Sequence, residues 1–359
     1  MKPSDKHKSA LNEVSGIISP NKTHQSSIDK IKIKRSKKID STTLINGIKK
    51  GDISLLSKGI TLIESTNSSH KKLAGEIIKS CLPLSGNSIR IGITGVPGVG
   101  KSTFIESFGT LLTQNGKKVA VLAVDPSSSV NKGSILGDKT RMESLIKNPN
   151  VYIRPSASGD NLGGVTKKTR ESIILCEAAG FDIILIETVG VGQSETAVHS
   201  MVDFFLLLKL AGAGDELQGI KRGIIEMADS IVINKADGDM KKVAELAKNA
   251  FRNALHLFPP KENEWTPEVL TCSALQNEGI AEIWELIKSY IQLTKSNKSF
   301  NKKRQEQEIF WLYDTINEQL KSQFYNNPKV KKELNQQLQL LEKKKTTPYE
   351  VASLLLRFK

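Results

Sequence analysis

The stretch Ser88-Ile-Arg-Ile-Gly-Ile-Thr94, followed by Gly95-Val-Pro-Gly-Val-Gly-Lys-Ser-Thr103, decides the fold of this chain. The first part has the short apolar pattern of a buried strand, and a helical segment begins at Ser102. Between them the sequence matches G-x-x-x-x-G-K-[ST], in which glycines let backbone N–H groups turn toward phosphate oxygens. The alternative is an ordinary glycine-rich turn before a helix, and the strand directly in front disfavours it. We therefore predict a phosphate-binding P-loop, formed by Gly95, Val96, Pro97, Gly98, Val99, Gly100, Lys101, Ser102 and Thr103.

Two side chains of this loop have defined roles in the motif. Lys101 reaches the β- and γ-phosphates of a nucleotide, and the hydroxyl of Ser102 binds Mg²⁺. The N-terminus of the following helix adds partial positive charge. The motif therefore predicts a nucleoside triphosphate as substrate and Mg²⁺ as its cofactor.

Short apolar runs of strand length follow along the chain and are separated by segments of helix length. They cover residues 118–124, 151–154, 182–186, 204–210, 230–233 and 268–271. Strands that alternate with helices form a mostly parallel sheet whose faces are covered. The expected fold class is α/β, a P-loop NTPase with a mostly parallel central sheet covered by helices.

The two ends of the chain differ from this central part. We expect a flexible basic leader at 1–40, an N-terminal helical segment at 41–85, the P-loop domain at 86–294 and a C-terminal helical arm at 295–359. The arm carries an apolar stripe, which either the P-loop domain or a second copy of the chain must cover. The stripe consists of Ile309, Leu312, Ile316 and Leu320.

Composition limits the classes of function. The formal net charge is +14, but its excess lies at the two ends, and only 5% of the residues are aromatic. A nucleic-acid interface is therefore disfavoured. Cys81, Cys176 and Cys272 are far apart and lack a CxxC or His neighbour, so we expect reduced structural thiols without a metal. Without a secretory signal or a membrane-spanning apolar run, we expect a soluble cytoplasmic protein; the mitochondrial matrix is less favoured.

A second motif, Asn234-Lys-Ala-Asp237, follows the apolar strand Ile231-Val-Ile233. It resembles the N-K-x-D motif of GTPases. Asp237 can accept hydrogen bonds from guanine N1–H and the exocyclic amine, whereas adenine lacks this donor pair and is rejected. We expect Asn234 to join the base loop to the P-loop, and the stem of Lys235 to cover a face of the base.

A third element lies at the end of the last strand. Cys272-Ser-Ala274 resembles the S-A element of GTPases, whose backbone N–H contacts the carbonyl oxygen of guanine. An ordinary junction between a strand and a loop is the alternative. Taken with the other two motifs, it predicts base contacts from Ser273, Ala274 and Leu275.

Carboxylates at strand ends are candidates for Mg²⁺, which prefers hard oxygen ligands. Asp125 and Glu187 each end an apolar strand, and Asp138 lies in a glycine-containing loop. A turn-forming or capping role is the alternative for each carboxylate, and it suits the two strand ends least. The predicted metal ligands are Ser102, Asp125, Asp138 and Glu187.

The segment Glu187-Thr-Val-Gly190 occupies the place of the D-x-x-G element of common GTPases. The N–H of Gly190 could bind the γ-phosphate and respond to its hydrolysis. A glutamine that would position water does not follow Gly190 directly, and Gln193 is the candidate. We expect slow intrinsic turnover and a partner that completes the site. The catalytic candidates are Lys101, Glu187, Gly190 and Gln193.

Several unbroken strings resemble the methylmalonyl-CoA mutase-associated GTPases, the MeaB/MMAA type or ArgK family. Besides the P-loop they are Val124-Asp-Pro-Ser-Ser128, Gly133-Ser-Ile-Leu-Gly-Asp-Lys-Thr-Arg-Met142, Glu187-Thr-Val-Gly-Val-Gly-Gln-Ser-Glu195 and Gly214-Asp-Glu-Leu-Gln-Gly-Ile-Lys221. The resemblance runs from about Ile45 to the C-terminus. It implies a GTP-hydrolysing chaperone that assists adenosylcobalamin loading and protects methylmalonyl-CoA mutase or a related acyl-CoA mutase. It also implies the same Mg²⁺ ligands, mobile loops near Asp138, near Gln193 and at 214–221, and a homodimer through the C-terminal helices.

Three other classes of protein share features with this sequence. A P-loop kinase, once linked to the transport of lysine, arginine and ornithine, is the main alternative, although N-K-x-D would be superfluous in it. A nucleic-acid-associated GTPase would use the basic ends of the chain. Nickel-insertion GTPases carry Cys/His ligand clusters, and this sequence has none.

Overall fold

The computed structural model describes residues 40–124, 142–155, 162–188, 193–212 and 222–358. Its strands are β1 (Ile89–Gly95), β2 (Val119–Val124), β3 (Val151–Arg154), β4 (Ile183–Thr188), β5 (Phe204–Leu210), β6 (Ser230–Asn234) and β7 (Glu268–Thr271). Before β1 lie α2 (Ser41–Lys49), α3 (Ile53–Glu64), α4 (Ser68–Cys81) and the 3-10 turn η1 (Leu82–Leu84). Between the strands lie α5 (Lys101–Gln114), α7 (Glu143–Ile146), α8 (Leu162–Ala178), α9 (Gln193–His199), α10 (Arg222–Met227) and α11 (Met240–Leu255). After β7 come α12 (Ile280–Ser296), α13 (Ser299–Asn326), α14 (Pro328–Glu342) and α15 (Pro348–Leu355).

The described strands form one seven-stranded sheet in the order β3-β2-β4-β1-β5-β6-β7, and every pairing in it is parallel. This confirms the predicted α/β fold. β1 lies in the middle, between β4 and β5, so the loop after Gly95 leaves the centre of the sheet. The register pairs Ile93 with Glu187 and Gly95 with Leu208, which brings the carboxyl ends of these three strands to one edge.

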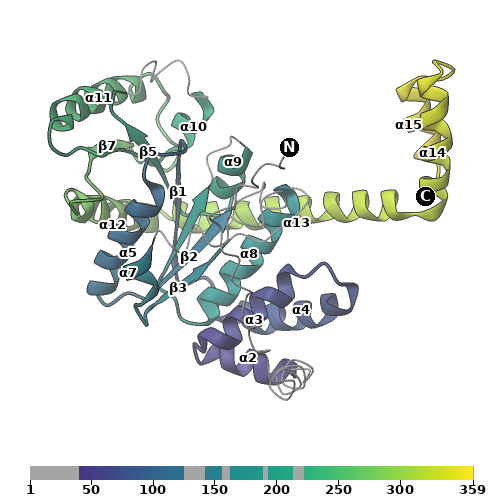
Figure 1. Cartoon of the computed structure of the whole chain (residues 1–359), viewed down its shortest axis with the longest axis horizontal. Helices are drawn as coiled ribbons and strands as arrows, with labels where there is room; N and C mark the ends of the chain where they lie inside the picture. The colour runs from purple at the N-terminus through teal and green to yellow at the C-terminus, as the bar shows by residue number, and fades with distance from the viewer. Residues whose placement is uncertain (1–39, 125–141, 156–161, 189–192, 213–221, 359) are drawn as a thin grey trace, which may run out of the picture.

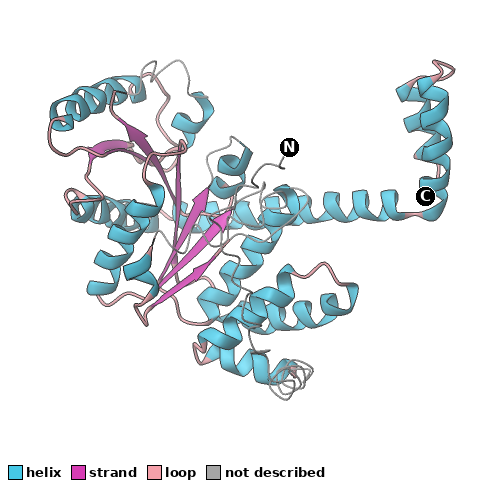
Figure 2. Cartoon of the chain, in the orientation of Figure 1, coloured by secondary structure: helices cyan, strands magenta, loops and turns pink. Residues whose placement is uncertain are grey.

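Helices cover both faces of the sheet (Figure 1). α5 and α12 pack on one face, where Phe104, Phe108 and Trp284 are buried. α8 and the N-terminal helices α2 to α4 form the other layer, in one apolar cluster with Ile184 and Ile186 of β4. Figure 2 shows the strands of the sheet lying between these helices. Because both faces are buried, the strands consist of near-continuous apolar runs.

Capping residues explain where several helices begin. The Asp52 carboxylate accepts the N–H of Leu55 at 3.0 Å and caps α3. The side chain of Asn327 caps α14 in the same way, and Thr347 forms a capping box with the glutamate in the first turn of α15. These bonds satisfy N–H groups that lack a partner inside the helix.

α13 leaves the body of the molecule as a long arm, and α14 and α15 form a hairpin at its far end (Figure 1). Its first turns are held by the sheet, since Arg304 donates to both carboxylate oxygens of Asp203 at 2.8 and 2.7 Å. Further along, the predicted stripe is open. The side chains of Ile309, Leu312, Ile316 and Leu320 are 56%, 58%, 42% and 58% exposed. Of the two covers considered for this stripe, the P-loop domain of the same chain does not provide one among the described residues.

Two further features concern the cysteines and the helices of the described residues. Cys81, Cys176 and Cys272 are buried free thiols. No described helix combines the length and the hydrophobicity needed to cross a membrane.

Candidate functional site

The P-loop connects the last residue of β1 to the first residue of α5. Gly95, Gly98 and Gly100 have φ values of +152°, +82° and +95°. A Cβ on Gly95 would lie 2.5 Å from the carbonyl oxygen of Leu208, and one on Gly100 would lie 2.8 Å from the Nδ2 of Asn234. Only glycine fits these positions, because the backbone is left-handed and the neighbours are close. Val96, Pro97, Gly98 and Thr103 are exposed, whereas Val99 is buried in the core.

Lys101 is folded back across the loop. Its ammonium group donates to the carbonyl oxygens of Gly95 at 2.9 Å and Val96 at 3.3 Å. The residue is 9% exposed, and burial lowers the pKa of its side chain, while the nearby carboxylates of Glu187 and Glu195 raise it. A buried cation with two carbonyl acceptors is well placed to exchange them for phosphate oxygens.

Two of the predicted metal ligands lie side by side. The Ser102 hydroxyl at the start of α5 donates to Glu187 Oε1 at 3.4 Å. Glu187 is buried on β4, next to the strand that leads into the P-loop. A hydroxyl and a carboxylate at this edge fit Mg²⁺, which takes oxygen ligands. The other two predicted ligands, Asp125 and Asp138, lie outside the described residues, as do Gly190 and the side chain of Gln193.

Sequence reasoning missed a contact that fixes Glu187. The Thr188 hydroxyl donates to Thr94 Oγ1 at 2.8 Å, and both threonines are almost completely buried. The bond joins the end of β4 to the end of β1, and so fixes the carboxylate relative to the P-loop. Its sequence signal is a hydroxyl beside each motif in otherwise apolar strands. Glu195 on α9 is a second buried carboxylate near Lys101, and no motif in the sequence assigns it a role.

Asn234 connects the P-loop to the loop that follows β7. Its Nδ2 donates to the Val99 carbonyl oxygen at 2.9 Å, and its Oδ1 accepts the N–H of Ala274 at 3.1 Å. The Cys272 thiol lies 3.4 Å from the same oxygen, and burial raises its pKa to about 12, so it stays protonated. The side chain of Lys235 extends over the P-loop to the Gly98 carbonyl oxygen at 3.0 Å.

Asp237 is held by a side chain of the loop that follows β7. The Ser273 hydroxyl donates to Asp237 Oδ2 at 2.5 Å and accepts the N–H of Gln276 at 3.2 Å. Leu275 projects from the loop and is 73% exposed. The structure therefore brings the N-K-x-D and S-A elements together beside the P-loop. They lie at the carboxyl ends of β6 and β7, where open α/β sheets bind ligands.

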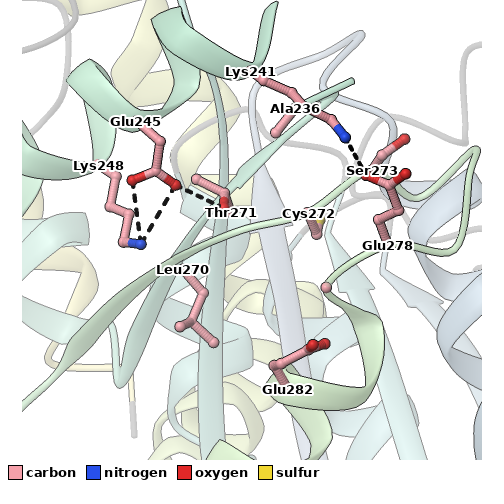
Figure 3. Close-up of a pocket in the computed structure, with 11 residues that line it drawn as sticks. Ala236, Lys241, Glu245, Lys248, Leu270, Thr271, Cys272, Ser273, Glu278 and Glu282 are labelled. Carbon is pink, nitrogen blue, oxygen red and sulfur yellow. Dashed lines mark hydrogen bonds and ion pairs between the residues drawn. The ribbon is translucent and has the colours of Figure 1, made fainter. Parts of the chain in front are cut away.

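A pocket of about 450 Å³ lies behind these loops, at the free edge of β7 (Figure 3). Ala236 and Ser273 line it from the base-recognition side, and charged side chains of α11 line it from above. Those charges are paired: Lys241 with Glu278 at 2.9 Å, and Lys248 with Glu245 at 3.4 Å. Neither Asn234 nor Asp237 lines this pocket, so it adjoins the candidate nucleotide site without being part of it.

The described residues contain no group of three or more His, Cys, Asp and Glu side chains arranged to hold a metal ion. A transition-metal centre of the Cys/His kind is therefore absent from the part of the chain that the structure describes.

A family model and several curated relatives that match this chain are all described as GTPases. The family described as methylmalonyl-CoA mutase-associated GTPase MeaB matches residues 56–329. A probable GTPase of Mycobacterium tuberculosis is 50% identical over 289 residues, covering 80% of this chain and 86% of the relative. The GTPase ArgK of Escherichia coli is 46% identical over 292 residues, covering 80% and 88%.

Two further relatives extend the comparison. The mitochondrial methylmalonic aciduria type A homolog of Mus musculus is 44% identical over 328 residues, covering 88% of this chain and 78% of the relative. A crystal structure of an LAO/AO transport system kinase superposes with a TM-score of 0.72 at 38% identity, covering 90% of this chain and 99% of that one. The resemblance inferred from the motifs is thus confirmed. This chain is a P-loop GTPase and belongs to the MeaB family of methylmalonyl-CoA mutase-associated GTPases.

Proposed function

We propose that this GTPase is a GTP-driven chaperone of an adenosylcobalamin-dependent acyl-CoA mutase, either methylmalonyl-CoA mutase or a related enzyme. It would assist loading of the cofactor and protect the mutase. The observation that carries the proposal is the family match over residues 56–329, which spans the P-loop, both base-recognition loops and the start of the arm. The family and one relative are named for the mutase and for methylmalonic aciduria.

In the proposed mechanism, Lys101 exchanges its two carbonyl acceptors for β- and γ-phosphate oxygens. Ser102 and Glu187 hold Mg²⁺, with Asp125 and Asp138 completing its ligand set. The metal, when bound, neutralises charge that develops on the phosphate oxygens during transfer to water. Gly190 and Gln193, which follow Glu187 in sequence, act at the γ-phosphate.

The base is read on the opposite side of the P-loop. Asp237, held by Ser273, accepts hydrogen bonds from the two guanine donors, and the Ala274 N–H binds the guanine carbonyl oxygen. Asn234 maintains the spacing between this loop and the phosphates, since it binds both Val99 and Ala274. Lys235 and Leu275 cover the base. The rejection of ATP follows, because adenine would leave the carboxylate of Asp237 unpaired.

The state of the nucleotide would reach the partner through α9 and the arm. β4 ends at Thr188 and α9 begins at Gln193, so a change at the γ-phosphate acts directly on α9. After α9, the Val202 carbonyl oxygen accepts from Gln307 of α13 at 2.8 Å. This contact supports a route from the phosphate site to the arm. The nucleotide-responsive loops that the resemblance implies near Asp138, near Gln193 and at 214–221 belong to the same proposal, and residues 125–141, 189–192 and 213–221 lie outside the described part of the chain.

A homodimer through α13 belongs to the same proposal. The apolar stripe of α13 is exposed in the described chain, and a second copy of the chain offers an identical stripe that could cover it. The division of the chain at residues 40, 85 and 294 also remains a proposal, as does a cytoplasmic location. The relatives include bacterial chains and chains named mitochondrial.

Cofactor loading tests the chaperone function. Methylmalonyl-CoA mutase without cofactor is mixed with adenosylcobalamin and this protein, in the presence of GTP, GDP or no nucleotide. Loading is followed by the absorbance of the corrin and by mutase activity. We expect the extent or fidelity of loading to depend on GTP and on an intact P-loop. Loading that is indifferent both to the protein and to the nucleotide would overturn the proposal.

A second candidate function is a P-loop kinase, because one similar solved structure is named as an LAO/AO transport system kinase. It would transfer the γ-phosphate to a small molecule or a protein instead of water. Incubation with γ-labelled GTP distinguishes the two candidates. Label found only in inorganic phosphate excludes the kinase, whereas label on an acceptor would support it.

A further inference from the structure

The loop after β7, residues 273–279, is closed at its base but open at its tip. Two backbone hydrogen bonds join Ser273 and Glu278, at 3.0 and 3.1 Å. Asn277 has a φ of +58°, and Gly279, which precedes α12, has a φ of +77°. The residues at the tip are exposed, so apolar packing does not fix them. We call residues 273–279 the guanine loop.

Two side-chain contacts connect the exposed part of this loop to other described elements: the surface ion pair of Glu278 with Lys241 of α11, and a hydrogen bond from α5. The Ser107 hydroxyl, in the second turn of α5, donates to Asn277 Oδ1 at 2.5 Å. α5 is the helix that begins with Lys101 of the P-loop. The bond therefore joins the helix that binds phosphate to the loop that contacts the base.

The two hydroxyls that follow Ser107 in the same helix behave differently. Thr110 donates to the carbonyl oxygen of Glu106 at 2.7 Å, and Thr113 donates to that of Thr110 at 2.9 Å. Bonds of this kind within a helix are the ordinary outcome for Ser and Thr. Ser107 is only 8% exposed, and its hydroxyl reaches across to Asn277 instead.

Apolar packing fixes the helices on both sides of this bond. Phe108 of α5 packs edge-on against Trp284 of α12, with ring centroids 6.1 Å apart. Phe104 stacks on Phe108, and Ile283 is fully buried in the same cluster. The loss of one hydroxyl would leave this packing in place. Loss of the bond between Ser107 and Asn277 should therefore change the position of the guanine loop without changing the packing of α5 against α12.

We propose that Ser107 and Asn277 are positioning residues for base recognition. Their bond holds the guanine loop so that the Ala274 N–H and the Ser273 hydroxyl stay aligned with the base and with Asp237. It sets part of the affinity for guanine nucleotides and leaves the binding of the phosphates unchanged. The inference rests on the base-reading roles of Asp237 and Ala274 proposed above.

Four variants separate this role from general effects on the fold. Ser107→Ala removes the donor, and Asn277→Gly removes the acceptor while keeping a residue that favours positive φ. Asn277→Asp keeps an oxygen acceptor in a residue type that tolerates the left-handed region. Thr110→Ala is the matched control, since it removes a hydroxyl of α5 whose hydrogen bond among the described residues is to the carbonyl oxygen of Glu106 in the same helix.

The affinities for GDP and for Mg²⁺-tripolyphosphate are measured by calorimetry. We expect Ser107→Ala and Asn277→Gly each to weaken GDP binding by about threefold to tenfold, the range for one hydrogen bond. The double variant should lose no more than the weaker-binding single variant, because both remove the same bond. Asn277→Asp should stay within about twofold of the unaltered protein, since an acceptor remains. The affinity for tripolyphosphate should be unchanged in every variant. Thr110→Ala should bind GDP with the affinity of the unaltered protein.

Three outcomes would overturn the inference: unchanged GDP affinity in both single variants, losses that add in the double variant, or an equal loss of tripolyphosphate affinity. Asp237→Asn tests the underlying base site separately. That variant should shift the preference from guanine to xanthine, because an amide reverses one donor and acceptor pairing. If it does not, the base-site proposal fails. If Asp237→Asn shifts the preference while Ser107→Ala and Asn277→Gly bind GDP with unchanged affinity, only the proposed role of the Ser107–Asn277 bond fails.

Discussion

At the scale of single residues, Lys101 shows how a binding site can be prepared before its ligand arrives. Its ammonium group already has acceptors in Gly95 and Val96, so the buried charge is not left unpaired. The same carbonyl contacts hold the side chain across the loop. Burial lowers the pKa of Lys101, and phosphate oxygens would favour its charged form again.

Lys101→Ala should therefore lower kcat for GTP by at least about 10²-fold and weaken nucleotide binding, because an electrostatic donor to the transferred phosphate is lost. Steady-state release of phosphate measures the first effect and calorimetry the second. Lys248→Ala is a suitable control, since that lysine lies on α11 and pairs with Glu245. An unaltered rate of GTP hydrolysis in Lys101→Ala would contradict the role of Lys101 at the transferred phosphate.

At the scale of elements, the junction between the sheet and α13 depends on buried charge. The carboxylate of Asp203 is 1% exposed and is matched by Arg304, which also donates to the Ser88 carbonyl oxygen at 2.7 Å. Lys303 donates to the carbonyl oxygen of the same aspartate at 2.7 Å. The arm is thus attached to the N-terminal ends of β1 and β5, on the opposite edge from the nucleotide site.

Arg304→Ala should lower the free energy of unfolding by about 3–5 kcal/mol, because it leaves Asp203 buried without its partner. The adjacent Lys302→Ala is the control. Its side chain is 62% exposed and its ion pairs lie at 3.4 and 3.8 Å, so we expect a change of no more than about 0.5 kcal/mol. Urea denaturation measures both, and equal effects would contradict the attachment described here.

His199 at the end of α9 makes the same junction sensitive to pH. Burial lowers its pKa to about 4, with Lys303 and Lys261 acting in the same direction and Asp229 opposing them. Its ordinary pKa in an unfolded chain is about 6.5. Between these two values the unfolded chain binds the proton and the folded chain does not, so stability is complete above about pH 6.5 and is lost as the pH falls toward 4.

We expect the free energy of unfolding to fall by roughly 1–2 kcal/mol from this group between pH 7 and pH 5, after allowing for partial exposure of the ring. His199→Gln should remove that part of the pH dependence. Urea denaturation of both proteins at the two pH values measures the difference. If the free energy of unfolding changes equally with pH in the unaltered protein and in His199→Gln, His199 is not the source of the pH dependence.

The elements were largely predictable from the sequence, whereas the contacts between them were not. The apolar runs at 118–124, 204–210 and 268–271 coincide with β2, β5 and β7 to within a residue. They were visible because both faces of a parallel sheet are buried. The contacts of Thr94 with Thr188 and of Ser107 with Asn277 join residues far apart in sequence. They depend on strand order and helix packing, which local periodicity does not encode.

At the scale of the whole molecule, the arm presents a stripe of apolar side chains to solvent. α13 projects from the body and ends in the α14–α15 hairpin, which has its own small core of Val330, Val351 and Leu355. The exposed apolar residues of α13 therefore lie between two packed units. Sequence alone left two possible covers for them, and the described residues of the P-loop domain in the same chain leave them exposed.

The combined variant Leu312→Asp and Ile316→Asp should convert a dimer to a monomer, because it places charge in the proposed apolar contact. Sedimentation at micromolar concentrations measures the change, and basal GTP hydrolysis should remain. Gln319→Asp, at an exposed polar position of the same helix, is the control. A monomeric unaltered protein, or a dimer that survives the double change, would contradict the arm interface.

The most direct test of the account is GTP hydrolysis by the purified protein, with ATP as competitor, measured with and without methylmalonyl-CoA mutase. We predict slow hydrolysis that excess ATP does not inhibit and that accelerates when the mutase is added, since the partner completes the site. Inhibition by ATP would contradict guanine recognition by Asp237. A rate that is indifferent to the mutase would contradict the proposed partnership and leave a GTPase whose partner must be sought elsewhere.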